Sequence, residues 1–408
     1  DAPAIRFKGF SDAWEQRKLG DIGETYTGLS GKTKADFGHG QARFVTYMNV
    51  FSNPISDPEM TEPIEIDPKQ NEVEVGDVFF TTSSETPEEV GMSSVLLEKR
   101  GKTYLNSFCF GFRPSEKIDS YYLAYMLRSE SARDKIILLA QGISRYNISK
   151  NKVMEIAVSL PSLDEQKLIG QYFRQLDNLI TLHQRKFEKL TNVKKSMLEK
   201  MFPQNGSSYP EIRFKGFTDP WEQRKLSEIA DKVTEKNAGL QYVETFTNSA
   251  EFGIISQRDF FDHDIAKLGS LDGYYIVKNE DFVYNPRIST SAPVGPINRN
   301  KLGRTGVMSP LYTVFRPHDV DTTYLEHFFK CAYWHSFMNF NGDSGARSDR
   351  FSIKDDVFFQ MPIPLPYIDE QRKIGELLTR LDHLITLHQR ELEKLQNIKK
   401  SMLEKMFV

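Results

Sequence analysis

The sequence contains few residues at spacings that could support catalysis. Gly28–Thr33 reads GLSGKT and is similar to the end of a phosphate-binding P-loop. The full pattern needs a glycine five residues before Gly31, where Tyr26 stands, so we do not expect a nucleotide site. Glu98–Lys99 could end a nuclease carboxylate–lysine site, but such pairs are common on strands by chance. No GxSxG, HExxH or CxxC pattern occurs.

The motif YNPR at Tyr284–Arg287 is close to the Asn-Pro-Pro-aromatic motif of adenine methyltransferases. Arginine stands where the second proline belongs, and no glycine-rich cofactor loop precedes the motif. We therefore expect no catalytic residue, no bound cofactor and no metal site in this chain.

The composition is that of a globular protein and does not by itself indicate nucleic-acid binding. The chain has 408 residues, which suggests two or three domains, a net charge of −3 and a pI of about 6.3. No apolar run reaches the roughly 18–20 residues of a membrane span. Cys109 and Cys331 lie among aromatic residues, so we expect two buried thiols in a reducing cytoplasm and no membrane association. Residues 284–317 are locally basic and contain no acidic residue.

The elements that must position any binding residue are repeated along the chain. Residues 164–202 and 369–407 are identical at 27 of 39 aligned positions, and both end in SMLEKMF. A second repeat relates IRFKGFSDAWEQRKL at 5–19 to IRFKGFTDPWEQRKL at 212–226. The chain is therefore a tandem duplication, and its two copies should be related by a pseudo-twofold axis.

Apolar residues in both copies of the long repeat recur at steps of three and four, which is typical of a helix with a narrow apolar seam. In the first copy, Pro161 and a capping box from Ser162 to Glu165 should mark the start, and Pro203 and Gly206 the end. Each helix would be roughly 55–60 Å long. One such helix cannot bury its own stripe, so we predict that the two pack as an antiparallel coiled coil.

Several copied residues lie off the apolar seam, where packing between the helices would not require identity. A shared external partner would require it, and two equivalent surfaces could bind two copies of one subunit. The predicted partner-binding residues are Gln184, Arg185, Lys194, Lys195, Gln389, Arg390, Lys399 and Lys400.

Two divergent blocks separate the repeated parts. Short segments at corresponding places in the two blocks are loosely similar. GDVFFTTSS at 76–84 matches EDFVYNPRIST at 280–290, and FRP recurs in both blocks. We predict an α+β fold of two globular mixed α/β domains separated by the two long helices. The predicted segments are 1–160 and 204–365 for the domains, and 161–203 and 366–408 for the helices.

The order of block, helix, block and helix resembles the specificity subunits of Type I restriction–modification systems. The resemblance covers essentially the whole chain. The residues that carry it are PSLDEQ at 161–166, PYIDEQRKIG at 366–375, the paired LITLHQR…SMLEKMF helices and the two WEQRKL segments. It implies that each block is a target recognition domain for one half of a split, asymmetric DNA site. The helix pair would then act as a spacer between the halves.

The same resemblance implies that this chain supplies sequence choice and no chemistry. Its partners would be double-stranded DNA, two methyltransferase subunits and, through them, two restriction subunits. S-adenosylmethionine would be bound by the methyltransferase subunits, which methylate adenine N6, and ATP and Mg by the restriction subunits.

Base readout uses donors such as Arg for guanine and Asn or Gln for adenine, while Ser, Thr and Lys hold phosphates. On this chemistry we predict DNA-binding residues in both blocks. Those of the first block are Lys32, Lys34, Arg43, Tyr47, Asn49, Ser83, Ser84, Arg145, Tyr146 and Asn147. Those of the second block are Arg258, Asn285, Arg287, Ser289, Arg304, Arg347 and Arg350.

Two alternatives stay open at this point. A related specificity subunit could serve a Type II system in which methyltransferase and nuclease are fused. A duplicated coiled-coil scaffold for proteins alone is the second alternative, and the near-neutral pI is its best support.

Overall fold

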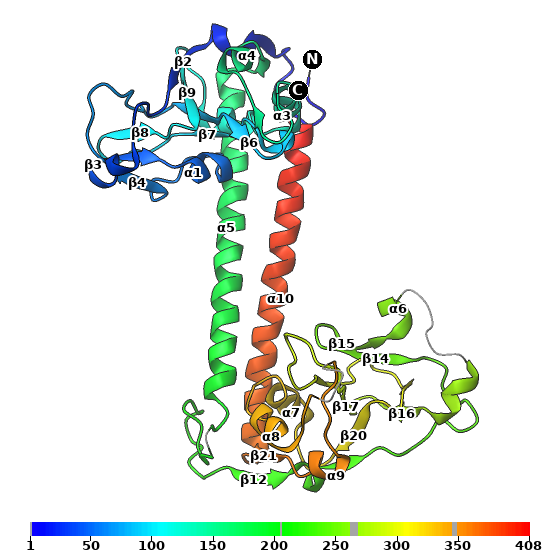
Figure 1. The fold of residues 1–408 in the computed structure, drawn as a ribbon. Helices are drawn as coiled ribbons and strands as arrows, with labels where there is room; N and C mark the ends of the chain where they lie inside the picture. Colours follow the sequence, from blue (N-terminus) through cyan, green and yellow to red (C-terminus); the bar gives the residue numbers. More distant parts are fainter. Residues whose placement is uncertain (1, 205, 262–267, 345–348) are drawn as a thin grey trace. The chain divides into compact units, whose positions relative to one another are not determined.

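The chain folds into two compact units, seen in a computed structural model that describes all residues except 1, 205, 262–267 and 345–348 (Figure 1). Unit 1 comprises Asp1–Gln184 and Gln389–Val408, and unit 2 comprises Arg185–His388. Each unit combines one globular block with one part of each long helix. No helix in the described ranges is both long and apolar enough to cross a membrane.

Unit 1 is built on a four-stranded antiparallel sheet in the order β2-β9-β5-β7. Its strands are β2 (Gly23–Thr27), β9 (Cys109–Pro114), β5 (Val78–Thr81) and β7 (Ser93–Val95). A second sheet contains β4 (Thr61–Ile64), β3 (Phe37–Val45) and β8 (Thr103–Leu105). The two-stranded pairs are β1 (Glu15–Lys18) with β11 (Ala157–Leu160), and β6 (Ser83–Ser84) with β10 (Tyr146–Asn147). The helices of this block are α1 (Tyr47–Ser52), α2 (Ser120–Met126), α3 (Glu130–Ile137) and α4 (Lys150–Met154).

Unit 2 repeats this plan with a four-stranded antiparallel sheet in the order β13-β20-β17-β18. Its strands are β13 (Ala230–Lys232), β20 (Thr313–Pro317), β17 (Phe282–Tyr284) and β18 (Ile297–Arg299). The two-stranded pairs are β12 (Glu222–Lys225) with β21 (Pro362–Leu365), β14 (Phe246–Ser249) with β15 (Gly253–Ser256), and β16 (Tyr275–Val277) with β19 (Gly306–Met308). The short helices are α6 (Gln257–Phe261), α7 (Thr322–Phe328), α8 (His335–Asn341) and α9 (Asp355–Phe358).

A buried carboxylate anchors the same point of both four-stranded sheets. In unit 1, Asp77 accepts two hydrogen bonds of 2.8 Å from Arg113 on β9. In unit 2, Asp281 accepts two hydrogen bonds of 2.8 Å from Arg316 on β20. Both aspartates are 1% exposed. These arginines belong to the two FRP segments, so the loose correspondence of the blocks in sequence reflects one shared scaffold.

The long helices are α5 (Leu163–Lys200) and α10 (Ile368–Lys405), and each unit contains part of both. In unit 1, Phe173 of α5 stacks on Phe407 just beyond α10, and Lys399 forms an ion pair with Asp177. In unit 2, Lys194 of α5 forms an ion pair with Asp382 of α10. The helices run antiparallel in each unit, which confirms the predicted fold class.

The segments that begin with IRFKGF tie two helix ends together in each unit. In unit 1 the backbone N–H of Ile5 donates to the Lys405 carbonyl, 2.9 Å away at the end of α10. Arg6 donates two hydrogen bonds of 2.7 and 2.8 Å to Glu165 in the first turn of α5. The corresponding residues of unit 2 are Ile212, Lys200, Arg213 and Glu370. We call each such arrangement a helix clamp.

The clamp corrects the predicted capping box. The Ser162 hydroxyl accepts from the Glu165 N–H at 3.4 Å, as a cap should. The reciprocal bond is not made, because the Glu165 carboxylate is buried against Arg6 instead. Half of the capping box is therefore replaced by a long-range ion pair.

In each unit, one hydrophobic core includes residues just beyond the end of a helix that begins in the other unit. In unit 1, Phe407 contacts Tyr122 and Phe173. In unit 2, Phe202 contacts Trp221 and Tyr324. These residues come from the copied SMLEKMF segments, so their identity has a reason in packing. Both cysteines are buried and free, as predicted, and burial raises the pKa of each to about 12.

Candidate nucleic-acid interface

Predicted DNA-binding residues of unit 1 meet where β6 pairs with β10. Ser83 lies opposite Asn147, and Ser84 lies opposite Tyr146. The Tyr47 hydroxyl donates to the Ser83 carbonyl at 2.8 Å. Ser83 and Ser84 are buried, whereas the Asn147 side chain is exposed. We call Ser83 and Asn147 the unit 1 cross-strand pair.

Unit 2 has a matching pair formed by Arg287 and Arg350, which make an antiparallel bridge. Both arginines are exposed. The Asn285 side-chain oxygen accepts from the Arg287 N–H at 2.9 Å, which fixes the local turn. We call Arg287 and Arg350 the unit 2 cross-strand pair.

Hydrogen bonds next to the bridges show that the two cross-strand pairs are equivalent. In unit 1 the Ile148 N–H donates to the Thr82 carbonyl at 3.0 Å. In unit 2 the Phe351 N–H donates to the Pro286 carbonyl at 2.7 Å. In unit 1 the donor follows Asn147 and the acceptor precedes Ser83. In unit 2 the donor follows Arg350 and the acceptor precedes Arg287, so the two arrangements match. The same scaffold position therefore presents serine and asparagine in one unit and two arginines in the other.

The unit 2 pair lines a groove of about 500 Å³. The groove walls include Asn285 and Ser289, which were predicted from sequence, and the aromatic residues Phe260 and Phe261 of α6. Arg287 and Arg350 are the charged residues among the described residues of the lining, and none of that lining is acidic. Within the described ranges, neither guanidinium has a carboxylate or hydrogen-bond partner. The groove is therefore suited to an anionic or electron-rich ligand.

A buried asparagine that sequence reasoning missed supports this groove. Asn248 is 1% exposed, and its side chain donates to the Val283 carbonyl at 2.7 Å. Its side-chain oxygen accepts from Asn298, and its backbone carbonyl accepts from the Asn285 side chain, both at 2.7 Å. Asn248 thus positions Asn285, which positions Arg287. No local sequence pattern distinguishes such an asparagine from one in a surface turn.

The other predicted DNA-binding residues of unit 1 differ in whether they are engaged within the chain. Lys32 forms an ion pair with Asp67 at 2.8 Å and is 12% exposed. Arg43 on β3 donates to the Thr61 hydroxyl at 2.6 Å. Lys34 and Arg145 are exposed, and Tyr146 is half-buried.

Asn49 requires a correction. It is fully buried in α1, and its amide donates to the carbonyls of Asp57 and Met60 at 2.7 and 3.0 Å. Its side-chain oxygen accepts from the Asp57 N–H. Because every polar atom of this side chain holds the 57–60 turn, we leave Asn49 out of the candidate interface.

The remaining predicted residues of unit 2 are placed as follows. Arg304 makes a bidentate ion pair with Glu244, with two contacts of 2.8 Å, and does not line the groove. Arg258 is exposed on α6. Arg347 lies outside the described residues.

The predicted partner-binding residues divide into two groups. Lys194 pairs with Asp382, and Lys399 pairs with Asp177, so both lysines form ion pairs between the helices. These pairs within the chain are a second reason why both lysines are identical in the two copies. Gln184 is half-buried. The exposed members are Arg185, Lys195, Gln389, Arg390 and Lys400.

Exposed leucines extend the copied surface and were not predicted. Leu179 and Leu182 on α5 are 43% and 45% exposed, and Leu384 and Leu387 on α10 are 40% and 44% exposed. Each pair belongs to the copied LITLHQR segment. A leucine pair left exposed at the same place in both copies is typical of a protein-binding surface rather than of a core.

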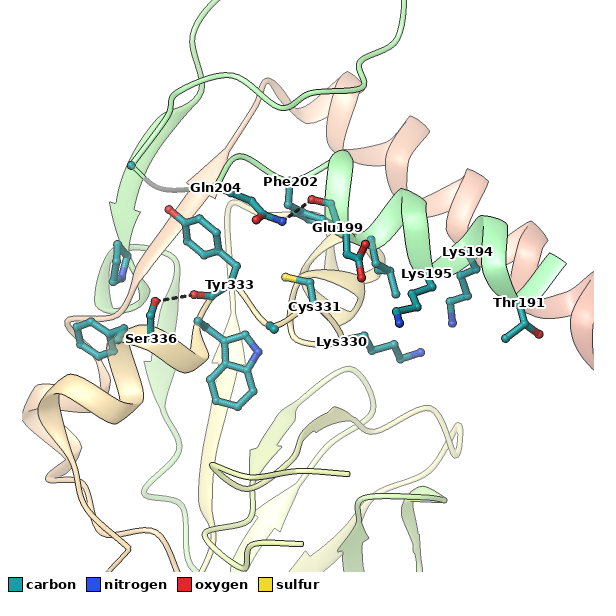
Figure 2. Close-up of a pocket in the computed structure, with 16 residues that line it drawn as sticks. Thr191, Lys194, Lys195, Glu199, Phe202, Gln204, Lys330, Cys331, Tyr333 and Ser336 are labelled. Atoms are coloured by element: carbon teal, nitrogen blue, oxygen red, sulfur yellow. Dashed lines mark hydrogen bonds between the residues drawn. The ribbon is translucent and has the colours of Figure 1, made fainter. Parts of the chain in front are cut away.

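In unit 2, Lys194 and Lys195 also line a pocket of about 710 Å³ (Figure 2). Tyr333, Trp334 and Phe337 contribute aromatic walls. The pocket is mainly apolar, with the lysines of α5 at its edge (Figure 2).

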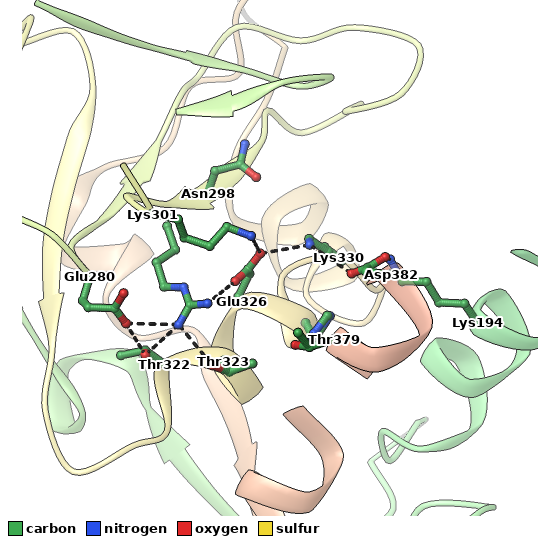
Figure 3. A network of polar contacts seen from close by, with 12 residues as sticks. Lys194, Glu280, Asn298, Lys301, Thr322, Thr323, Glu326, Lys330, Thr379 and Asp382 are labelled. Atoms are coloured by element: carbon green, nitrogen blue, oxygen red, sulfur yellow. Dashed lines mark hydrogen bonds and ion pairs between the residues drawn. The ribbon is translucent and has the colours of Figure 1, made fainter. Parts of the chain in front are cut away.

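A charged network connects β18 of unit 2 to its helix pair (Figure 3). Glu326 on α7 accepts from Arg299 at 2.6 Å, Lys301 at 2.7 Å and Lys330 at 3.0 Å. Lys330 in turn lies 3.8 Å from Asp382 on α10. Burial opposes ionisation of Glu326, but the surrounding lysines outweigh it and lower its pKa to about 2. The globular block of unit 2 is thus joined to the helices by ionised groups.

Among the described residues, no group of three or more His, Cys, Asp or Glu side chains could hold a metal ion. The groove of unit 2 brings together exposed guanidinium groups, side-chain amides and aromatic side chains.

Comparison with known proteins agrees with this architecture. The family model for the Type I restriction modification DNA specificity domain matches twice, at residues 11–192 and 218–397. The MjaX type I specificity subunit sequence of Methanocaldococcus jannaschii is 25% identical, covering 96% of this chain and 92% of its own length. The MjaVIII specificity subunit of the same organism is also 25% identical, covering 76% of this chain and 74% of its own length.

A crystal structure of the Type I restriction–modification S subunit from M. genitalium has a similar fold. It aligns with a TM-score of 0.54 and 13% identity over 100% of this chain and 99% of that one. Because the family model matches both halves, the chain belongs to the family of Type I restriction–modification specificity subunits and contains two specificity domains in tandem.

Proposed function

We propose that this chain is the non-catalytic subunit that selects the DNA target of a Type I restriction–modification complex. Each globular block would read one half of a bipartite, asymmetric site, and the helix pair would act as the spacer. The observation that carries the proposal is the equivalence of the two cross-strand pairs. One scaffold presenting different side chains at one position suits two halves that differ in base sequence.

Two methyltransferase subunits would dock on the two copied helix surfaces, and two restriction subunits would join through them. The exposed leucine pairs support this part, because identical surfaces bind identical partners. S-adenosylmethionine would belong to the methyltransferase subunits, and ATP and Mg to the restriction subunits. The assembled complex would act on DNA in the cytoplasm.

The test is to express the chain with its methyltransferase partner and sequence the DNA of those cells for N6-methyladenine. We expect methylation within one motif that has two constant halves and an unspecified gap. Methylation without any sequence preference would contradict the proposal, as would methylation by the chain alone. A partner-only culture provides the control.

A further inference from the structure

We infer that Arg287 and Arg350 contact guanine in the half-target bound by unit 2, and that the equivalent position of unit 1 does not read guanine in this way. The inference rests on the proposed function and adds the identity of a base to it. It follows from three features: the electrostatics of the unit 2 cross-strand pair, the lining of its groove, and the difference between the units.

The unit 2 cross-strand pair places two positive charges directly opposite each other. Side chains at bridged antiparallel positions project from the same face and lie close together, and like charges there are destabilising. Within the described ranges no carboxylate compensates either arginine. Such an arrangement is stabilised when a ligand supplies electron-rich acceptors for both guanidinium groups.

The groove provides the rest of the recognition chemistry. A guanidinium presents a planar fork of donors, and the N7 and O6 acceptors of guanine match that fork in the major groove. The turn fixed by Asn285 and Asn248 holds the backbone of Arg287 in place. Phe260 and Phe261 supply apolar surface beside the arginines. A backbone held at this point directs the Arg287 side chain into the groove, where its planar fork can meet a base edge.

The two units differ at the cross-strand pair, and this difference favours base contacts over phosphate contacts there. The sugar–phosphate backbone is the same in both half-targets, so residues that hold it have no reason to differ between equivalent positions. At the cross-strand pair, unit 1 instead has a buried serine and an exposed asparagine, Asn147, whose amide suits adenine rather than guanine.

The experiment selects duplexes from a random library with the complex of this chain and its methyltransferase partner. The variants are Arg287→Gln, Arg350→Gln and Arg287→Lys. Arg224→Gln is the matched control, because Arg224 lies on β12, outside the groove, and contacts Glu228. We expect each groove variant to reduce guanine preference at one or two positions of a single half by about 5- to 150-fold, and the control to leave both halves unchanged.

Arg287→Lys distinguishes the two kinds of contact, because lysine keeps the charge but loses the planar fork. Loss of guanine preference with lysine supports the inference. Uniformly weaker binding with unchanged preference in the glutamine variants would mean phosphate contacts and overturn it. Unchanged binding, or equal changes in both halves, would also overturn it. If the wild-type complex selects no sequence, the proposed function itself fails, which is a separate result.

Discussion

Burial controls the protonation of His327, a residue of α7 beside the charged network of unit 2. The side chain is 1% exposed, and its Nε2 lies 3.1 Å from the Thr379 hydroxyl. Burial, assisted by the neighbouring Lys330, lowers its pKa to about 3. The folded protein therefore keeps this imidazole neutral, while the unfolded chain protonates it near the ordinary value of about 6.5.

This difference predicts that unit 2 loses stability as the pH falls below about 6.5. The unfolded state then binds one more proton than the folded state, so unfolding becomes easier by about 1.4 kcal/mol for each pH unit between 6.5 and 3. Urea denaturation at pH 7 and pH 5 should show a smaller loss in His327→Gln than in the wild type. The exposed His318→Gln is the control. Equal losses in all three proteins would contradict the assignment.

At the scale of elements, the helix clamps join segments that are distant in sequence. Arg6 and Glu165 are 159 residues apart, yet their side chains are only 14% and 1% exposed. A buried carboxylate that loses its cation stays desolvated and unpaired, which makes such pairs sensitive to single substitutions. The clamp therefore connects the N-terminal segment to both helix ends of unit 1.

Replacing Arg6 with alanine should destabilise unit 1 far more than an ordinary surface substitution, because it leaves the Glu165 carboxylate buried without a partner. Arg17→Ala is the matched control, since Arg17 pairs with the exposed Glu116 and its loss should cost little. Hydrogen–deuterium exchange of peptides from unit 1 in increasing urea, read by mass spectrometry, reports on that unit alone. Similar losses for both variants would mean that the clamp is no stronger than a surface ion pair.

The exposed leucines make a prediction about assembly. Leu179→Ser with Leu182→Ser should weaken the docking of one methyltransferase subunit and leave the other site intact. Native mass spectrometry should then show a complex with one such subunit, where we expect the wild type to hold two. Leu384→Ser with Leu387→Ser should have the same effect through the other copy. Full occupancy in both double variants would contradict a docking role for these leucines.

At the scale of the whole molecule, each core is completed by a helix end from the other half of the sequence. Unit 1 needs Met406 and Phe407, and unit 2 needs Met201 and Phe202. Because both ends read SMLEKMF, either one should fit either core. Each half of the duplicated chain thus supplies residues that complete the hydrophobic core of the other half.

Residues 1–203 expressed alone should therefore form a dimer in which each copy supplies its own Phe202 to the core of the other. Size-exclusion chromatography with light scattering would measure the mass. Phe202→Ala should shift the fragment toward monomer, because a large aromatic side chain is removed from the core, at a cost of roughly 3–5 kcal/mol per site. A folded, monomeric wild-type fragment would contradict this view of the cores.

Sequence patterns predicted the elements better than the binding surface. The helices follow from apolar periodicity, and the two blocks were matched through features such as FRP, which the Asp77–Arg113 and Asp281–Arg316 pairs explain. The bridge between Arg287 and Arg350 could not be predicted, because it joins two loop segments, distant in sequence, that only the fold brings together. For the same reason nothing in the sequence indicates that Asn49 is buried or that Lys32 is paired with Asp67.

The cross-strand pairs also have an evolutionary consequence. Within the described ranges, the side chains of Arg287 and Arg350 support no other part of the fold, so substitutions there should not destabilise it. New target preferences can then arise by gradual mutation without passing through unstable proteins. The chain carries two independent copies of this position, so if each unit reads one half-target, as proposed, a lineage could alter one half while the other half stays constant.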